Sequence, residues 1–351
     1  MPIKSAPLKA RPTVLADWIE LSVLANISYP FRLASLKRYR DTHRETEDSD
    51  SEGNHKREDD TDLDGISGED DDIFLDAIIE EISDRERALD DAYPFQFDGS
   101  GLKLKLKDDL TDGGYIYLLC LFLSNPKADD IFDGSWLPEI NDHARDLLQV
   151  SATMAAAGEA AGCAISFGWP RPNQNPPFLE KLREVYALMG EGILVENPWP
   201  GTSPSPKDAE IDVIAWTPRP DKAPGTFYLL GQVASGGNWR GKSMKTAAER
   251  FHKDWFLRQP VSTVNPSIFI PHDIKSTSDF KRKDILHSET TEFGTIFDRL
   301  RLPKFALDGI KLSAERTDLT IERKDEIPKI VTWVSSQLQN LQNCFNTNPT
   351  C

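Results

Sequence analysis

The spacing of apolar residues in the first third of the chain predicts helices. Apolar residues recur at steps of three and four over 15–24, and the same spacing returns over 73–89. Tyr93-Pro94 follows and should end the second helix, because proline disfavours a helical conformation at the residue before it. A further helix is expected at 137–164, which closes in a run of small residues. We therefore expect 1–165 to be a mainly helical N-terminal region.

Shorter elements interrupt these helices. Residues 103–107 alternate Leu with Lys, which is typical of a short strand, and Asp112-Gly113-Gly114 predicts a turn. The apolar run 115–123 that follows is the longest in the chain and predicts a buried strand or a short core helix.

The second half of the chain alternates helices with strands. A helix is predicted over 178–189, closed by Gly190, and a second helix, rich in Lys and Arg, over 239–258. Strands are predicted at 193–196, 211–216, 226–234 and 267–270. The order helix, three strands, helix, strand is that of an α/β unit with a hairpin in its sheet. We place this core at 166–275 and expect a C-terminal extension at 276–351, with a terminal amphipathic helix over 327–345.

The charge of the chain is uneven. The whole chain has a formal charge of −16, which argues against a polyanionic partner. Residues 41–72, however, hold fifteen acids and three bases, a sum of −12, so the remaining residues carry −16 − (−12) = −4. Residues 219–324 hold nineteen bases and thirteen acids, a sum of +6. We expect 41–72 to be a solvated, disordered insertion, since it offers little apolar surface to bury, and to act as a dispensable or autoinhibitory tether.

Two classes of protein are not favoured by the sequence. No apolar run approaches the roughly 18 residues that a membrane-spanning helix needs, and the N-terminal segment lacks the apolar stretch of a secretory signal. We therefore expect a cytoplasmic protein without a membrane partner. The cysteines lack the spacings of a zinc site or a disulfide framework; they are Cys120, Cys163, Cys344 and Cys351.

Two polar residues stand in strands that are otherwise apolar. Asp212 lies in Ile211–Trp216, and Gln232 lies near the end of the next predicted strand. Pairing of the two strands would bring both side chains to one end of the sheet, where they could hold Mg²⁺ or Mn²⁺ together with the backbone carbonyl of Val233. Such a metal site suits hydrolysis of a phosphodiester.

The segments KDAEIDVIAW and FYLLGQVAS, preceded by a helix that begins FLEKL, resemble the PD-(D/E)xK, or restriction-endonuclease-like, nucleases. The resemblance covers about 175–272 and is closest to members with Gln in place of the second acid. It implies a helix acid at Glu180, a metal-binding Asp212, and Gln232 at the variable position. Glu184 is the rival helix acid, and Asp208 and Glu210 are turn acids or further metal ligands.

The lysine that the family places two residues after the Glu or Gln is missing, since that position holds Ala234. Some members of the superfamily supply this amine from a neighbouring element, and here Lys242 is the first candidate and Lys245 the second. The string from Gly236 to Ser243 also fits the P-loop pattern, but it follows the second arm of a predicted hairpin, which does not favour nucleotide hydrolysis.

The helix after Gln232 interleaves bases with aromatic residues. Its bases would contact DNA phosphates beside a nuclease site, or they would form the solvated face of an ordinary amphipathic helix. The predicted DNA contacts are Arg240, Lys245, Arg250 and Lys253. The cluster Lys281-Arg282-Lys283 is either a further DNA contact or a solvated tip. His252 is expected to be structural or on the surface, and Glu191 is expected to be exposed.

The resemblance thus predicts a metal-dependent DNA endonuclease, with catalytic residues Glu180, Asp212, Gln232 and Lys242. It implies the setting of bacterial antiviral defence and a regulatory or sensor protein as a partner, and it leaves open a homo-oligomer. The alternative is a catalytically inactive nuclease fold that binds DNA or a partner protein.

Overall fold

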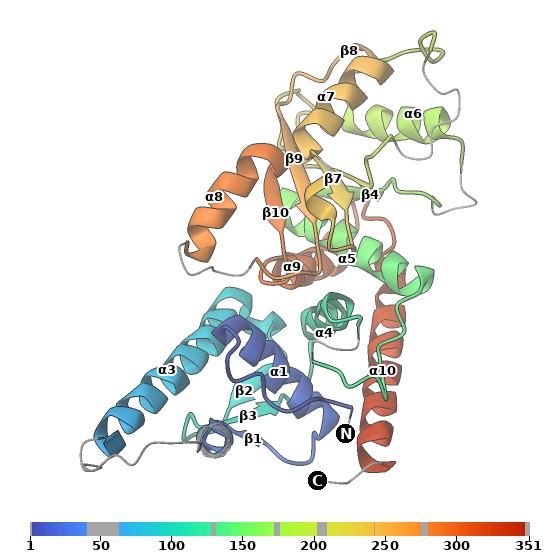
Figure 1. The fold of residues 1–351 in the computed structure, drawn as a ribbon. Helices are drawn as coiled ribbons and strands as arrows, with labels where there is room; N and C mark the ends of the chain where they lie inside the picture. Colours follow the sequence, from blue (N-terminus) through green and yellow to red (C-terminus); the bar gives the residue numbers. More distant parts are fainter. Residues whose placement is uncertain are drawn as a thin grey trace. The chain divides into compact units, whose positions relative to one another are not determined.

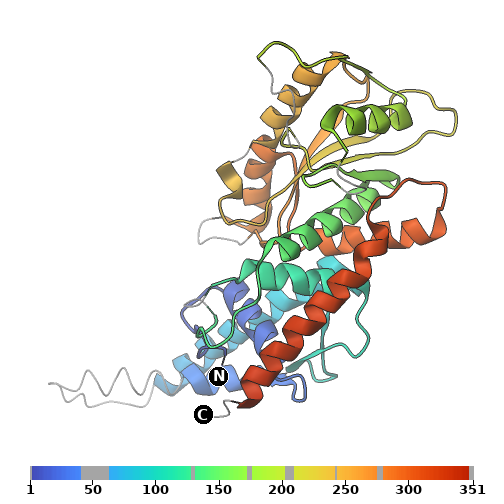
Figure 2. The ribbon, with the colours of Figure 1, turned by 90° about the vertical axis from the view of Figure 1, so that its right-hand side faces the viewer.

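The structure is a computed structural model that describes residues 2–40, 63–127, 131–171, 176–201, 209–241, 243–274 and 280–347, with the backbone alone for 63–70. The fold is mixed α/β (Figures 1 and 2). None of the described helices is both long enough and apolar enough to cross a bilayer. The chain divides into two compact units: unit 1 is 1–109, 127–137 and 336–351, and unit 2 is 110–126 and 138–335. This division differs from the boundary predicted at 165.

Unit 1 combines helices with a small sheet. Its main elements are α1 (Pro12–Ala25), β1 (Phe31–Arg32), a helical segment at 34–40, α3 (Leu63–Leu89), β2 (Phe95–Phe97) and β3 (Lys103–Leu106). The strands form an antiparallel sheet in the order β1-β3-β2, which the prediction of a mainly helical region did not include beyond the strand at 103–107. The periodic stretches at 15–24 and 73–89 are helical, as predicted.

A buried arginine joins α3 to α1 in unit 1. The fully buried guanidinium of Arg85 donates to Asp17 at 2.8 Å, to Glu20 at 2.9 Å and to Glu81 at 2.9 Å. Glu20 also accepts from the hydroxyl of Tyr93 at 2.8 Å. Each buried charge therefore has hydrogen-bonded partners of the opposite sign, which is the condition for its burial to be tolerated.

The acidic segment is more ordered at its end than the sequence predicted. Residues 41–62 lie outside the described part of the chain, but α3 begins at Leu63, inside the segment expected to be disordered. Asp71 is buried and pairs with Arg40 at 2.8 Å, and Asp72 pairs with Lys37. The bases that precede the insertion therefore neutralise Asp71 and Asp72, and the prediction of a disordered backbone is wrong for 63–72, which is helical.

Unit 2 is built on a five-stranded sheet. Its strands are β4 (Cys163–Ser166), β6 (Val213–Trp216), β7 (Tyr228–Val233), β9 (Val264–Phe269) and β10 (Thr295–Phe297). The order is β10-β9-β7-β6-β4. β6 is antiparallel to both of its neighbours, while β7, β9 and β10 are parallel to one another, so the carboxyl ends of these three strands meet at one edge (Figure 1). This is the edge at which open α/β sheets bind ligands.

Helices cover both faces of this sheet. The helices of unit 2 are α4 (Asp112–Ser124), α5 (Asp142–Ala160), α6 (Phe178–Met189), α7 (Met244–Trp255), α8 (Arg282–Phe293), α9 (Leu302–Glu315) and the first part of α10 (Ile327–Thr347). α5 packs on β4, β6 and β7, while α7 and α8 cross between the parallel strands and pack on β9. α6 packs on the α7 side, since Phe178 contacts Trp255 and Tyr186 contacts Tyr228.

The close contact of α5 with α9 explains the small residues at the end of α5 (Figure 1). A Cβ added at Gly158 would lie 2.1 Å from the carbonyl oxygen of Phe305, and one at Gly309 would lie 2.0 Å from that of Met154. Real Cβ atoms do not approach an oxygen so closely, so the two backbones can touch only through glycine.

Several predicted elements have other forms or places. Asp112-Gly113-Gly114 is the first turn of α4 rather than a turn between strands, because the side chain of Thr111 caps this helix by accepting from the amide of Gly114 at 3.1 Å. The helix predicted to run to Ala164 ends at Ala160, and β4 follows.

One predicted strand lies outside the five-stranded sheet, and one strand of that sheet was not predicted. The strand predicted at 193–196 is β5 (Ile193–Leu194), which pairs with β8 (Phe256–Arg258) in a separate two-stranded sheet, whereas β4 pairs with β6. The predicted C-terminal extension supplies β10 and α9 to the same unit and is not a separate addition. The helices at 178–189 and 327–345 and the other predicted strands are confirmed within a few residues.

Candidate functional site

Asp212 and Gln232 lie together at the carboxyl end of β7. The ladder between β6 and β7 places Val213 opposite Gly231, so Asp212 adjoins the last residues of β7. The backbone amide of Asp212 donates to the carbonyl oxygen of Gly231 at 2.8 Å, and its carboxylate Oδ2 accepts from the backbone amide of Val233 at 2.8 Å. Asp212 therefore bonds to the residues on both sides of Gln232. The prediction that the two strands form a hairpin is confirmed.

The side chain of Gln232 is buried, and its oxygen lacks a hydrogen bond from any described residue. It is 4% exposed, and its Oε1 accepts no hydrogen bond from the part of the chain that the structure describes. Its register neighbour on β9 is Ile268, an apolar residue. An unsatisfied buried polar atom costs about 1–3 kcal/mol, so a sequence selected for stability alone would not place a glutamine here.

The exit loop of β4 and a glutamine of α5 hold the backbone of Asp212. Its carbonyl oxygen accepts from the amides of Phe167 at 2.7 Å and Gly168 at 3.0 Å, and from Nε2 of Gln149 at 2.6 Å. A Cβ added at Gly168 would lie 2.7 Å from Oδ1 of Asp212. The position of this carboxylate therefore depends on three elements of unit 2, and any side chain larger than glycine at 168 would collide with it.

The sequence interpretation missed Gln149 and chose another helix for the acid. Glu180 is exposed on α6, and it makes no hydrogen bond or ion pair with another described residue. The helix that reaches Asp212 is α5, and the residue it contributes is an amide rather than an acid. Gln149 carries a signal that could have been used, because it is a half-buried polar residue between Leu148 and Val150 in an apolar stretch.

The rival acid Glu184 belongs to a different cluster. The amine of Lys181 is buried and lies 3.4 Å from Glu184 and 2.5 Å from Glu322. Burial raises the pKa of Glu322, against the lowering effect of Lys181. Glu322 in turn accepts from the backbone amide of Ser166 on β4 at 3.0 Å. This cluster therefore stabilises β4, and Glu184 is not at the end of β7.

The place of the expected lysine is filled by core packing. Ala234 is buried in an apolar cluster with Trp239, Ile268 and Leu286. Lys242 lies outside the described residues, as does Asp208. Glu210 forms an ion pair with Arg250. Glu210 therefore neutralises a predicted DNA contact.

The basic helix α7 is amphipathic. Its apolar side chains are buried, and Lys245 and Lys253 are exposed. Arg240 pairs with Glu289 of α8 at 2.6 Å and lies 4.3 Å from the ring centre of Trp239. Among the four predicted DNA contacts, the two lysines are thus exposed, whereas the two arginines are engaged with acids of the chain itself.

The donor set at the end of β7 consists of oxygen atoms, which suits a hard divalent cation. It contains one carboxylate, from Asp212, and one amide oxygen, from Gln232, beside the backbone of Val233. In the described part of the chain, no three His, Cys, Asp or Glu side chains are grouped closely enough to hold a metal. A magnesium ion at this end of β7 would therefore take its other ligands from water and from the substrate, as Mg²⁺ commonly does.

The opposite end of β7 carries polar groups that satisfy one another. The buried hydroxyl of Tyr228 bonds to the hydroxyl of Tyr186 and lies 3.0 Å from Nε2 of His252. Burial lowers the pKa of His252 from its ordinary value of 6.5 to about 4. Its expected structural role is confirmed.

Glu191 is also buried at this end of the sheet, so the expectation that it is exposed is wrong. Its carboxylate accepts from the amide of Gly225 at 3.0 Å, and from the amide and the hydroxyl of Ser262 at 3.0 and 2.6 Å. These bonds join the loop after α6 to the turn between β6 and β7, through Gly225, and to the loop between β8 and β9, through Ser262.

Comparison with known protein families, with curated proteins and with solved structures finds no match to this chain. The functional assignment therefore rests on the residues and contacts of the chain itself.

Proposed function

We propose that the chain is a metal-dependent DNA endonuclease of the PD-(D/E)xK kind, with its active site at the carboxyl end of β7. The order of elements supports this proposal. The resemblance implies helix, three strands, helix, strand, beginning with α6; the structure has this order beginning with α5, as α5, β4, β6, β7, α7 and β9, once α6, β5 and β8 are set aside as insertions. Asp212 directly precedes β6, and Gln232 lies near the end of β7, in the places that the family pattern gives to its metal-binding Asp and its Glu or Gln.

One observation carries the proposal: Oε1 of Gln232 is buried and accepts no hydrogen bond from the described residues, and the next residue, Val233, bonds through its amide to the carboxylate of Asp212. A buried oxygen acceptor left over next to a segment that holds a carboxylate is expected where a cation completes it. Asp212 and Gln232 would hold Mg²⁺ or Mn²⁺, which would lower the pKa of a bound water and neutralise charge on the phosphate.

The remaining residues position these donors. The amide of Val233 fixes one carboxylate oxygen of Asp212, and Gln149 and Gly168 fix its backbone, so the carboxylate does not need to reorganise when a cation binds. Lys242 would supply the cationic group that orients the attacking water or the phosphate. It follows β7 by nine residues, in the segment that leads into α7.

A second candidate function is a catalytically inactive member of the same fold that binds DNA or a partner protein. The observation that favours it is Ala234, which stands where the family has its lysine and is buried in apolar packing. Asp212 also has a structural use, since its carboxylate caps the amide of Val233.

A plasmid-cleavage assay with Mg²⁺ or Mn²⁺ separates the two functions. Wild type should nick or linearise plasmid DNA, and Asp212→Asn should lower the rate by about 10²–10³-fold, since it removes the metal-binding charge but keeps an acceptor for Val233. Lys242→Ala should lower the rate comparably if this lysine is the displaced amine. Asp221→Asn, an exposed acid in the turn between β6 and β7, is the matched control and should cleave as wild type does.

Cleavage that survives Asp212→Asn would refute the site. An absence of cleavage by wild type under all metal conditions, with retained DNA binding, would establish the inactive alternative.

A further inference from the structure

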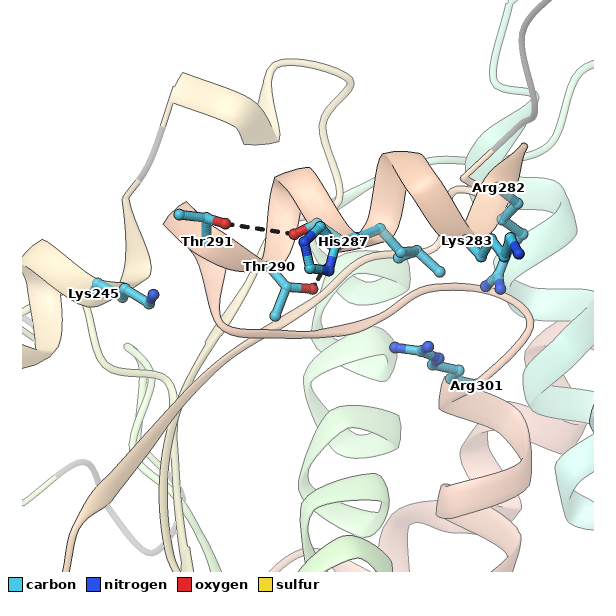
Figure 3. A pocket seen from close by; sticks show the side chains of 8 residues that line it. Lys245, Arg282, Lys283, His287, Thr290, Thr291 and Arg301 are labelled. Carbon is cyan, nitrogen blue, oxygen red and sulfur yellow. Dashed lines mark hydrogen bonds between the residues drawn. The ribbon is translucent and has the colours of Figure 1, made fainter. Parts of the chain in front are cut away.

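A second polar site lies between α7, α8 and the start of α9. It is a pocket of about 610 Å³ in unit 2. Its charged lining comes from three segments that are far apart in the chain: Lys245, Arg282, Lys283, His287 and Arg301 (Figure 3). Figure 3 shows Lys245 reaching toward α8 from one side and Arg301 reaching toward it from another.

The pocket is cationic in a chain that is acidic overall. Four Lys or Arg side chains line it, and none of the described lining residues is an acid. The acids that act on these cations stand outside the lining: Asp298 and Asp273 pair with Arg282, and Glu159 of α5 interacts electrostatically with Arg301. Like charges gathered in a concave site repel one another, and an anion that enters relieves this repulsion.

Two of the cations are held in place by the fold. Arg282 bonds to Asp298 at 2.5 Å and lies 3.7 Å from Asp273, and both of these acids are buried at the carboxyl ends of β10 and β9. Arg301 donates to the carbonyl oxygen of Ile296 at 3.1 Å. Guanidinium groups fixed in this way lose little entropy when they bind, and their forked geometry suits phosphate oxygens.

The lining favours one kind of ligand over another. Its described residues include no Phe, Tyr or Trp, and Leu286 is the one large apolar residue among them. The imidazole of His287 is then the one ring of the described lining on which a nucleobase could stack, whereas a phosphate needs only the cations. The chemistry therefore favours the backbone of a nucleic acid over a free nucleotide recognised by its base.

The pocket shares its supporting core with the candidate nuclease site. Leu286 lines the pocket and also packs in the apolar cluster that contains Ala234, two residues after Gln232. Trp239, in the segment that follows β7, contacts Phe293 of α8 with ring centres 5.0 Å apart. A ligand held on α8 thus lies against the same packed layer that supports the end of β7.

We propose that this pocket binds a backbone phosphate of the DNA substrate, at a position next to the bond that is cut. The inference rests on the proposed function for the identity of the substrate. It assigns Lys283, Arg282 and Arg301 to DNA binding together with Lys245, and it gives the Lys281-Arg282-Lys283 cluster a binding role rather than that of a solvated tip. The contact positions the duplex without reading its sequence.

Salt-dependent binding tests the pocket without requiring catalysis. The probe is a fluorescein-labelled 20-base-pair duplex in EDTA, with affinity measured by anisotropy over a range of salt concentrations. Each phosphate contact contributes about 0.9 to the slope of log affinity against log salt, so Lys283→Gln and Lys245→Gln should each lower the slope by about one, and the double variant by about two. Lys222→Gln, an exposed lysine in the turn between β6 and β7, should leave the slope unchanged.

If the double variant keeps the wild-type slope of log affinity against log salt concentration, the proposal that this pocket binds a DNA phosphate is wrong. A second arm titrates inorganic pyrophosphate by calorimetry: if the double variant loses pyrophosphate binding but keeps the DNA slope of wild type, the pocket takes free phosphates and the proposal fails. Because binding is measured without metal, a wild type that binds DNA through these lysines but cuts nothing would support the pocket and refute the endonuclease. Urea unfolding of each variant checks that the fold is intact, and both lysines are exposed.

Discussion

Strand β7 has polar residues at both ends, and the two ends differ in how these groups are satisfied. At its start, Tyr228 bonds to Tyr186 and His252 inside the core. Near its end, Gln232 is as deeply buried, yet its oxygen has no hydrogen-bond donor in the described part of the chain. The strand is the same and the burial is the same, so neither accounts for the difference.

The comparison separates polar groups that stabilise the fold from polar groups kept for a ligand. A buried polar cluster whose donors and acceptors match one another needs nothing from outside, whereas an acceptor left over lowers stability until something binds it. The start of β7 is of the first kind, and its end is of the second. Stability should therefore depend on the start of β7, and function on its end.

The largest expected effect on stability is at Glu191, beside the start of β7. Burial raises the pKa of this carboxyl, but bonds from Ser262 and Gly225 outweigh it and hold the pKa below its ordinary range. Glu191→Ala removes the acceptor of three donors and should lower the free energy of unfolding by about 3 kcal/mol, measured by urea denaturation. Glu180→Ala, at an exposed glutamate of α6, is the control for stability and should change it by less than about 0.5 kcal/mol.

DNA affinity of the folded Glu191→Ala protein should equal that of wild type. If Glu191→Ala lowers the free energy of unfolding by less than about 1 kcal/mol, the start of β7 contributes little to stability. The contrast between the two ends of the strand would then be wrong.

A smaller effect should appear as a dependence of stability on pH at His252. Its folded pKa is about 4 and its ordinary value is 6.5, so between these values the unfolded chain binds a proton that the folded chain does not. Stability should therefore fall as the pH falls from 6.5, by about 1.5 kcal/mol on reaching pH 5. Urea denaturation at several pH values measures this loss.

His252→Gln should remove this loss of stability between pH 6.5 and pH 5. His143→Gln, at an exposed histidine of α5, should leave the loss unchanged. If the free energy of unfolding depends on pH equally in wild type and in His252→Gln, burial does not hold the imidazole neutral.

The smallest expected effect on stability is the sharpest test of the end of β7. Gln232→Met keeps the length of the side chain and removes the unsatisfied oxygen, so the free energy of unfolding should stay the same or rise by up to about 1 kcal/mol. Cleavage of DNA should fall at the same time. Gln149→Met is the matched control and should destabilise by about 1 kcal/mol, since it removes a bond of 2.6 Å to the backbone of Asp212.

A clear loss of stability in Gln232→Met would show that the oxygen already serves the fold. The end of β7 would then resemble its start, and the case for a cation there would be withdrawn.

Much of the framework could be predicted from the sequence, because it depends on local patterns. The helix α6 and the strands β6, β7 and β9 lie where the spacing of apolar residues and the turn residues indicated them. Asp212 and Gln232 stand out in the sequence because each interrupts an apolar stretch, and their proximity follows from a hairpin, which is a short-range structure.

The rest of the site depends on contacts between distant segments. β4 follows a run of small residues that reads as helix, and only its pairing with β6 shows that Cys163–Ser166 is a strand. The resemblance implies a helix acid at Glu180 of α6, yet the helix that reaches Asp212 is α5, through Gln149, sixty-three residues away. The pocket between α7, α8 and α9 likewise depends on distant segments, since both Lys245 and Arg301 line it.

The sequence by itself determined which segments are helices or strands, which polar residues stand out in them, and where the charge changes sign. These properties are set by neighbours along the chain, through side-chain periodicity and turn chemistry. The tertiary structure alone decided that Glu191 is buried and satisfied, that Gln232 is buried and unsatisfied, and that Lys283 and Arg301 line one pocket. Whether a buried polar group has a hydrogen-bond partner depends on the atoms that surround it in the folded protein. The spacing of residues along the chain does not specify those atoms.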